Sequence, residues 1–219
     1  MKVLIIGANG QIGQHLIKKL QESGRHQPVA MVRKEDQQLK FESQGVKTAL
    51  VDLEESVDKM VEAMKEVEAI VFTAGSGGHT GADQTMMIDL DGAIKSMKAA
   101  KKANVKRFVI VSAIGIHQWH ENNHPEWMDR TPYYSAAKYY ADVWLENSGL
   151  DYTIIRPGGL TNESGTGKVE IGDNLQMAMI PREDVATTIT LVLENNNSIG
   201  KAFDLTSGQI PIEKAIKTL

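Results

Sequence analysis

Tyr134 and Lys138 lie four positions apart in the stretch YSAAK, and their types and spacing suit proton transfer. Side chains four apart in a helix share one face, so the phenol and the ammonium would be neighbours. A phenol with a pKa near 10 is a poor acid or base at neutral pH, but a nearby positive charge stabilises the phenolate and lowers that pKa. Tyr134 is therefore a candidate to exchange a proton with an alcohol or carbonyl oxygen, and Ser112 is a candidate to hold that oxygen. The same spacing also arises by chance, so the pair needs support from its surroundings.

The first twenty residues, MKVLIIGANGQIGQHLIKKL, provide such support. The apolar run at 3–6 is typical of a short buried strand, and apolar residues then recur at spacings of three and four between 12 and 20, as in a helix. A helix start offers unpaired N–H groups and a positive dipole end, which favour a phosphate. Gly7 would allow the tight turn, Gly10 the close approach of a pyrophosphate, and Gly13 close packing of the helix on the strand. Ordinary turn chemistry remains the alternative interpretation.

Strands and helices alternate along most of the chain. The apolar runs predict strands at 28–32, 46–52, 68–75, 106–115 and 151–159, and helical spacing predicts helices at 56–65, 82–103 and 133–149. This order predicts an α/β fold, a doubly wound, Rossmann-like parallel sheet with helices on both faces. Ligands of such sheets bind beyond the carboxyl ends of the strands, which here are residues 7–13, 33, 52, 74–78, 112–117 and 156–160.

We expect the 219 residues to form a single domain. Its dinucleotide-binding core would span about 1–156. Residues 157–219, which include GKVEI, a helix at 183–194 and KAFDL, would supply a small C-terminal lobe on the substrate side. The polar stretch TNESGTG at 161–167 is typical of a loop.

The composition narrows the classes of function. A net charge of -4 gives no general attraction to nucleic acid or anionic membranes, so neither partner is expected. The absence of cysteine excludes disulfides and thiolate metal sites. With no signal peptide or long apolar segment, we expect a cytoplasmic protein, a monomer or homodimer, acting on a small molecule.

The residue that ends the second strand indicates which dinucleotide binds. An acidic residue there favours NAD, whereas arginine accommodates the 2′-phosphate of NADP. Arg33 followed by Lys34 therefore predicts NADP rather than NAD, unless these are two solvated charges at a strand end. Asp52, expected to end the third strand before Leu53, is placed to meet the adenine edge, although such an aspartate also caps helices.

The motifs together resemble the short-chain dehydrogenase/reductase superfamily. They are GANGQIG at 7–13, DLEE at 52–55, TAGSGG at 73–78, VKRFVIVSAIG at 105–115, YSAAK at 134–138 and DYTIIRPGGL at 151–160. Within it, the chain looks like the atypical NAD(P)-binding branch related to extended epimerases, NmrA-like proteins and flavin or biliverdin reductases. The resemblance covers about residues 1–190.

The resemblance implies specific roles. Tyr134 would be the acid/base, Lys138 a ligand of the nicotinamide ribose, and Ser112 would orient the substrate. The remaining roles belong to the cofactor site: backbone at Asn9, Gly10, Gln11 and Ile12 would hold the pyrophosphate, Ala74 and Gly75 would lie beside the cofactor, and Pro157 and Gly158 would border the nicotinamide. Retention of the serine, tyrosine and lysine favours an enzyme.

Two further features admit competing interpretations. The segment HQWHENNHPEW places three histidines within 117–124 and tryptophans at 119 and 127. No helical metal-binding spacing is present, so we expect no metal, and the segment is interpreted as an aromatic substrate-side lid or as a surface loop. Arg182 in IPREDVA either reaches an anionic substrate group or belongs to an ordinary helix start, which the neighbouring proline and acids favour.

The sequence thus predicts an NADPH-dependent oxidoreductase that acts on a small carbonyl, alcohol or quinone-like compound, with reduction as the expected direction. An enzymatic alternative is an epimerase or dehydratase acting on a nucleotide sugar. A non-catalytic NADP-binding redox sensor is the alternative from another class.

Overall fold

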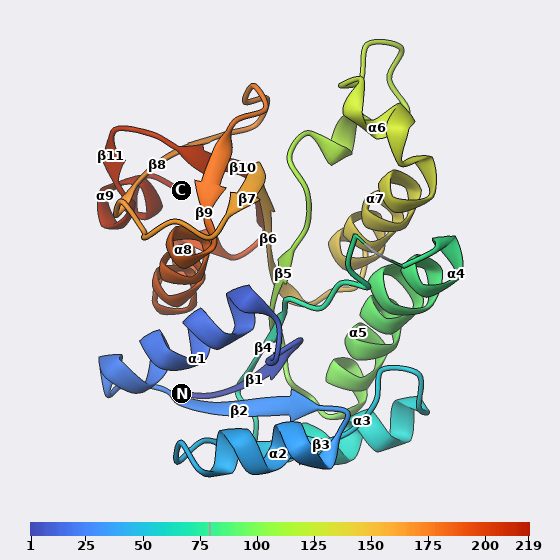
Figure 1. Cartoon of the computed structure of the whole chain (residues 1–219), viewed down its shortest axis with the longest axis vertical. Helices are drawn as coiled ribbons and strands as arrows, with labels where there is room; N and C mark the ends of the chain where they lie inside the picture. The colour runs from blue at the N-terminus through green and yellow to red at the C-terminus, as the bar shows by residue number, and fades with distance from the viewer. Residues whose placement is uncertain (79) are drawn as a thin grey trace.

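The computed structural model describes residues 1–78 and 80–219. Over these residues, nine strands form one sheet in the order β11-β8-β10-β6-β5-β4-β1-β2-β3, and β7 and β9 form a separate pair (Figure 1). Every neighbouring pair from β3 to β10 is parallel, whereas β8 and β11 are antiparallel to their neighbours. The predicted doubly wound α/β fold is confirmed.

The bounds of the elements are as follows. The strands of the main sheet are β1 (Lys2–Ile6), β2 (Gln27–Val32), β3 (Lys47–Leu50), β4 (Ala69–Phe72), β5 (Arg107–Val111), β6 (Asp151–Pro157), β8 (Lys168–Gly172), β10 (Lys201–Ser207) and β11 (Ile210–Pro211); β7 (Gly159–Thr161) and β9 (Met179–Pro181) form the small sheet. The helices are α1 (Gln11–Ser23), α2 (Glu35–Glu42), α3 (Val57–Ala63), α4 (Ala82–Gln84), η1 (Thr85–Gly92), α5 (Ala93–Lys102), η2 (Ile116–Gln118), α6 (Trp127–Arg130), α7 (Pro132–Glu146), α8 (Arg182–Glu194), η3 (Asn196–Ser198) and α9 (Ile212–Lys217).

Two apolar clusters cover the two faces of the main sheet. One contains Leu16 of α1 and Ile189 of α8, and the other contains Met60 of α3, Met97 of α5 and Leu145 of α7. Figure 1 shows α1, α8 and α9 together on one side and α3, α5 and α7 on the other. The apolar strands therefore have both faces buried, as a parallel sheet requires. Their carboxyl ends meet at the edge where the functional residues were expected.

The long helix predicted at 82–103 is one helical segment with an irregular middle. It begins as α4, passes through the π-helical η1 and ends as α5. η1 buries the acidic Asp89 at 2% exposure. Single π turns inside helices occur often at functional sites. Sequence periodicity did not predict this change of helical pitch.

Several other boundaries differ from the prediction. GKVEI and KAFDL, expected in a C-terminal lobe, instead extend the main sheet as β8 and β10. β3 ends at Leu50, so Asp52 follows the strand by two residues, and its carboxylate accepts the N–H of Glu54 at 3.0 Å. α7 ends at Glu146, three residues before Gly149, whose φ of 75° continues the turn out of the helix.

Candidate functional site

The glycine turn between β1 and α1 is held by backbone contact. Gly7 has a φ of 90°, and a Cβ there would lie 2.5 Å from the Ala74 nitrogen. A Cβ at Gly13 would lie 2.4 Å from the Gly7 oxygen, which explains why the helix start requires glycine against the strand end. Gly10 N–H donates to the Gly7 oxygen at 2.9 Å and closes the turn.

The start of α1 fits a phosphate. No side chain caps this helix, and its first turn contains no acidic residue. Gly10, the residue before the helix, lines a cavity, and its nearest neighbour to an added Cβ is the Gly7 oxygen at 3.1 Å. A pyrophosphate can therefore approach the first N–H groups of α1 without meeting a side chain.

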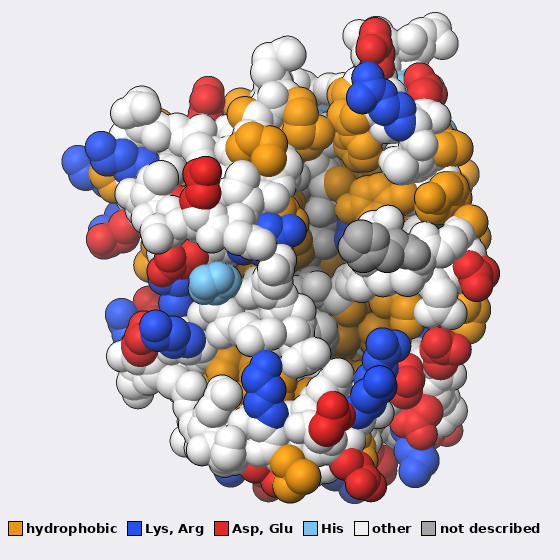
Figure 2. Space-filling model, in the orientation of Figure 1, with side chains coloured by type: hydrophobic (Ala, Val, Ile, Leu, Met, Phe, Trp, Pro, Cys, Tyr) orange, Lys and Arg blue, Asp and Glu red, His pale blue; other side chains and the backbone are white. Residues whose placement is uncertain are grey.

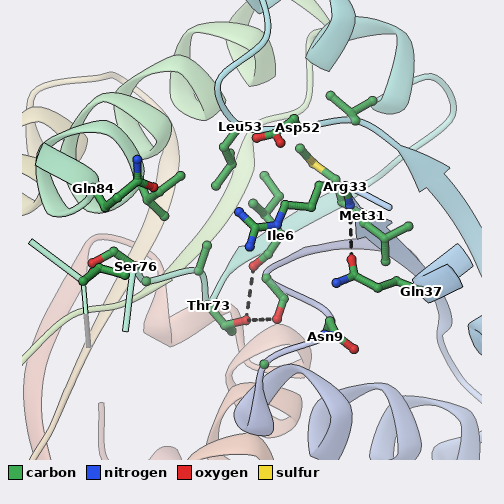
Figure 3. Close-up of a pocket in the computed structure, with 18 residues that line it drawn as sticks. Ile6, Asn9, Met31, Arg33, Gln37, Asp52, Leu53, Thr73, Ser76 and Gln84 are labelled. Carbon is green, nitrogen blue, oxygen red and sulfur yellow. Dashed lines mark hydrogen bonds between the residues drawn. The ribbon is translucent and has the colours of Figure 1, made fainter. Parts of the chain in front are cut away.

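Arg33 lies in this first cavity, which has a volume of about 350 Å³. Figure 3 shows its guanidinium extending across the cavity toward Ile6 and Thr73, with Asp52 and Leu53 along the opposite rim. The backbone N–H of Arg33 donates to Gln37 Oε1 at 3.4 Å. The Thr73 hydroxyl donates to the carbonyl oxygen of Ile6 at 3.1 Å and ties β4 to β1 below the cavity. The adenosine end of a dinucleotide would thus meet one cation.

A second cavity, of about 580 Å³, continues from the first. Of the residues that the structure describes, six line both cavities: Gly10, Thr73, Ala74, Gly75, Ser76 and Thr80. Tyr134, Lys138 and Ser112 all line the second cavity, although Ser112 is separated from Tyr134 by a long loop in sequence. In Figure 2 the molecule is hollowed along its middle, with hydrophobic side chains gathered on one wall. The structure therefore brings the predicted phenol, ammonium and hydroxyl to one cavity, next to the glycine turn.

Lys138 has a buried acidic neighbour that sequence analysis missed. Its ammonium donates to the carbonyl oxygen of Val111 at 2.9 Å and lies 4.0 Å from Asp89 Oδ1. The other oxygen of Asp89 accepts the N–H of Ser76 at 2.9 Å. Lys138 and Asp89 are only 3% and 2% exposed, so the pair has little screening by solvent. The two lie 49 positions apart, and no local spacing signalled their meeting.

The pKa of Tyr134 does not shift as the sequence argument expected. Burial raises the pKa of this phenol above its ordinary value, and the Lys138 charge lowers it by less. Asp89 and Asp142 also raise it. With only the protein's own groups around it, the phenol therefore stays protonated at neutral pH and can act as an acid. Lys138 alone does not lower the pKa of Tyr134 below its ordinary value, because desolvation outweighs the single ammonium. Further lowering by a cationic nicotinamide ring beside the phenol stays a prediction.

Ser112 lies against a buried ion pair. Its hydroxyl is close enough to Asp142 to lower the pKa of that carboxyl, but the contact does not have hydrogen-bond geometry. Burial still raises the Asp142 pKa overall, while Arg156 Nε donates to the carboxylate at 3.0 Å. Ser112 is 5% exposed, and its buried hydroxyl has no hydrogen-bond partner among the described residues, so it can bond to a ligand oxygen.

The segment with three histidines is a folded connection between β5 and α7. Its histidines have separate neighbours: His117 is 3.0 Å from Asn174 Oδ1, His124 is 3.0 Å from Asp129 Oδ1, and the His120 ring lies 4.4 Å from that of Tyr139. Among the described residues, no three His, Asp or Glu side chains are placed to hold a metal ion. Trp127 lines the second cavity, and its ring centroid lies 6.5 Å from that of Tyr134. The aromatic wall of the lid interpretation is thus present at Trp127.

Some predicted site residues line neither cavity. Lys34 is exposed and precedes α2 as its cap residue. Pro157 is buried at the end of β6. A Cβ at Gly158 would lie 2.0 Å from the Ala178 oxygen, so close packing against that backbone explains this glycine. Leu160, two residues further on, lines the second cavity instead.

Arg182, which sequence analysis favoured as part of a helix start, lies at a helix start and at the edge of a cavity. It is the first residue of α8 and also lines the second cavity. Its Nη1 donates to Asn162 Oδ1 at 2.7 Å. Only the return of α8 toward the start of α1 places it there, and sequence spacing does not encode that return.

Dinucleotide binding at a glycine turn, with proton transfer in the adjoining cavity, is the division of labour in NAD(P)-binding Rossmann oxidoreductases and epimerases. The chain has the architecture of that class. It matches the model of the NAD(P)H-binding family over residues 7–196 and belongs to that family. The resemblance to atypical short-chain dehydrogenases/reductases is confirmed.

Some proteins similar to this chain are named as epimerases and others as oxidoreductases. It is 49% identical to the uncharacterized sugar epimerase YhfK of Bacillus subtilis (strain 168) over the full length of both chains. A solved putative NAD-dependent epimerase/dehydratase from Bacillus halodurans is 41% identical, with a TM-score of 0.91 and full coverage of both chains. The solved oxidoreductase ylbE from Lactococcus lactis is 34% identical, with a TM-score of 0.88, covering 100% of this chain and 96% of that one.

A more distant relative is named for a reduction. Sanguinarine reductase of Eschscholzia californica is 27% identical, over 99% of this chain and 93% of its own. The family therefore contains reductase and epimerase names. In the part of the chain that the structure describes, none of the helices has the length and apolar character to span a membrane.

Proposed function

We propose that the protein is an NADPH-dependent reductase of small carbonyl or quinone-like compounds. One observation carries the proposal: Tyr134, Lys138 and Ser112 line a cavity that shares a wall with the cavity above the glycine turn. A reductase needs an acid at the point where a hydride arrives, and a phenol whose pKa is raised by burial meets that need.

The residues of the chain divide the work as follows. When bound, NADPH supplies a hydride to the carbonyl carbon of the substrate. Ser112 donates a hydrogen bond to the carbonyl oxygen and orients it, and Tyr134 gives that oxygen its phenolic proton. Lys138, four residues along the same helix, stabilises the phenolate that remains. Asp89 holds the lysine within the site at 4.0 Å.

The choice of NADPH rests on Arg33. Its guanidinium extends into the first cavity at the end of β2, where a 2′-phosphate would lie. Arg33 occupies the strand-end position at which an acidic residue would favour NAD, and the next residue, Lys34, is basic as well. The oxidation of NADPH in the presence of aldehydes, ketones and quinones is therefore the expected activity.

The test compares wild type, Tyr134→Phe and Tyr140→Phe. Tyr140 lies on the same helix but is 47% exposed and outside both cavities, so it is a matched control. Consumption of NADPH, followed by its absorbance with each member of a carbonyl and quinone panel, should be lost only in Tyr134→Phe. Equal activity of the two variants would contradict the proposal.

A second candidate function is epimerisation or dehydration of a nucleotide sugar. The printed names of two similar proteins favour it. An epimerase interconverts its sugars without net consumption of the dinucleotide. Proton NMR of nucleotide sugars incubated with the protein and NADP or NAD would detect a new epimer or dehydrated sugar, whereas a reductase would leave these sugars unchanged.

A further inference from the structure

The charges that line the second cavity do not balance. Among its described lining residues, the ionised side chains are those of Lys138, Asp89 and Arg182. Lys138 and Asp89 lie 4.0 Å apart and offset each other. Arg182 then contributes a net positive charge to a cavity that is partly closed to solvent.

Arg182 is held by a neutral partner. Its hydrogen bond goes to the amide oxygen of Asn162 at 2.7 Å, and it makes no ion pair with a described residue. The two acids that follow it in sequence are committed elsewhere. Glu183 accepts from Lys19 at 3.1 Å and from Gly165 N–H at 2.9 Å. Asp184 accepts the N–H groups of Thr166 and Gly167 at 2.8 and 2.9 Å.

The hydrogen bond to Asn162 orients the guanidinium of Arg182, and the commitment of Glu183 and Asp184 to other partners leaves its charge uncompensated. The same loop that contains Asn162 is fixed at its far end by Asp184, which is 1% exposed. The hydrogen bond to Asn162 and the first turn of α8 therefore hold Arg182 from two sides. A preoriented guanidinium binds a carboxylate strongly because its planar donors match the two oxygens.

The rest of the wall fits a flat ring with hydrogen-bond acceptors. Aromatic side chains of Trp127, Tyr133 and Tyr134 line the cavity, and Leu160 adds apolar surface. Among the described groups, the indole N–H of Trp127 and the hydroxyl of Ser112 are buried donors without an acceptor. An aromatic molecule bearing a carbonyl would stack on the rings and supply such acceptors.

We propose that the substrate is a planar aromatic carbonyl compound with a carboxylate, and that Arg182 binds this carboxylate. This inference rests on the proposed reductase function. Arg182 shares the second cavity with Ser112 and Tyr134, and the first residues of α1, Gln11 and Ile12, line that cavity too. The guanidinium is assigned to the substrate because it lies in the cavity of the proton donor, and the backbone N–H groups of α1 are assigned to the cofactor pyrophosphate. The affinity of an Arg182 variant for NADPH distinguishes the two.

A pair of matched probes tests the assignment. 4-Carboxybenzaldehyde and methyl 4-formylbenzoate have the same ring and aldehyde and differ in the negative charge. Their binding to the protein saturated with NADP⁺ is measured by calorimetry, which needs no turnover, and their reduction is measured with NADPH. The variants are Arg182→Gln and, as a control, Arg130→Gln, an exposed arginine of α6 outside both cavities.

Wild type and Arg130→Gln should bind the carboxylate about tenfold more tightly than the ester, since a hydrogen bond to a charged group is lost with the ester. Arg182→Gln should bring the two affinities to within about twofold of each other and leave the NADPH affinity unchanged. Equal affinity of wild type for both probes, or binding of neither, overturns the inference. A large loss of NADPH affinity in Arg182→Gln with the probe preference intact also overturns it, because the guanidinium then binds the cofactor.

The two proposals fail in different ways. Charge-dependent binding of the carboxylate without NADPH-dependent reduction of any carbonyl would contradict the reductase function and support the assignment of Arg182. Reduction of both probes with equal kcat/KM would support the reductase and overturn the assignment.

Discussion

The carboxylate of Asp89 lies 4.0 Å from the ammonium of Lys138, and both side chains are buried beside Tyr134. The acid comes from the π-helical segment η1 and the lysine from α7. Burial raises the pKa of Tyr134 most, and the pair adds to this in opposite directions, because Lys138 lowers that pKa and Asp89 raises it. The pH dependence of reduction follows from that arrangement.

The rate of reduction should fall only at high pH. Burial raises the pKa of Tyr134 above its ordinary value, so the acid form persists through neutral pH and is lost as pH rises through the raised pKa. Asp89→Asn removes a group that raises this pKa, and the alkaline fall in kcat/KM should therefore begin at lower pH. A profile measured from about pH 6 to 10.5 checks the direction, since unperturbed tyrosine titrates near 10. An unchanged or upward-shifted profile would refute the role of Asp89.

Replacement of the phenol should affect chemistry rather than binding. Tyr134→Phe removes the proton donor, and loss of a general acid should lower kcat by about 100-fold or more. The ring that remains keeps its packing against Trp127, so the Kd for NADPH should change by less than about twofold. Single-turnover kinetics and a fluorescence titration measure the two quantities separately. A variant with full kcat would remove Tyr134 from the mechanism.

Two glycines of the turn should differ when changed to alanine. A Cβ at Gly13 would lie 2.4 Å from the Gly7 oxygen, so Gly13→Ala should prevent the native turn and lower the thermal midpoint. A Cβ at Gly10 meets its nearest atom at 3.1 Å, so Gly10→Ala should still fold but obstruct the pyrophosphate. Circular dichroism melting and NADPH titration distinguish the two effects. Equal loss of stability in both variants would argue that Gly10 has only a structural role.

The loop at 162–167 should depend on a single buried carboxylate. Asp184→Ala removes the acceptor of Thr166 N–H, Thr166 Oγ1–H and Gly167 N–H. Bonds of this kind to a charged group suggest a loss of about 3 kcal/mol in the free energy of unfolding. Urea denaturation monitored by tryptophan fluorescence measures the loss, and a change below about 0.5 kcal/mol would contradict this account.

Glu183 offers the comparison on the same turn. Its side chain is 36% exposed and bonds Lys19 and Gly165, so Glu183→Gln should cost less than about 1 kcal/mol. The hydrogen bond from Gly165 and the charge of Lys19 lower its pKa. Its stabilising contribution is therefore complete above the pKa of the unfolded chain and is lost as pH falls through the lowered folded pKa. The difference between wild type and Glu183→Gln should disappear in acid, and growth of that difference in acid would give the wrong sign.

Local patterns predicted the parts of the molecule that depend on local physics. The strand at 3–6, the glycine turn and the helical spacing of Tyr134 and Lys138 follow from short-range geometry, and the structure has them. Asp89 and Arg182 reach the cavity through packing between distant elements, η1 against α7 and α8 against α1. The same is true of β10, whose place in the main sheet depends on pairing with β6, and of β8, which pairs with β10. No spacing within one segment encodes these meetings.

The central claim is that the first cavity binds NADPH through Arg33. The direct measurement is a titration of wild type, Arg33→Ala and Lys34→Ala with NADPH and NADH, followed by nicotinamide fluorescence. Lys34 is an exposed neighbour that lines neither cavity, so its variant is the matched control. Wild type should prefer NADPH, and Arg33→Ala alone should weaken NADPH binding about tenfold or more while leaving NADH affinity unchanged. Failure of wild type to bind either dinucleotide, or equal affinity for both that Arg33→Ala leaves unaltered, would contradict the account.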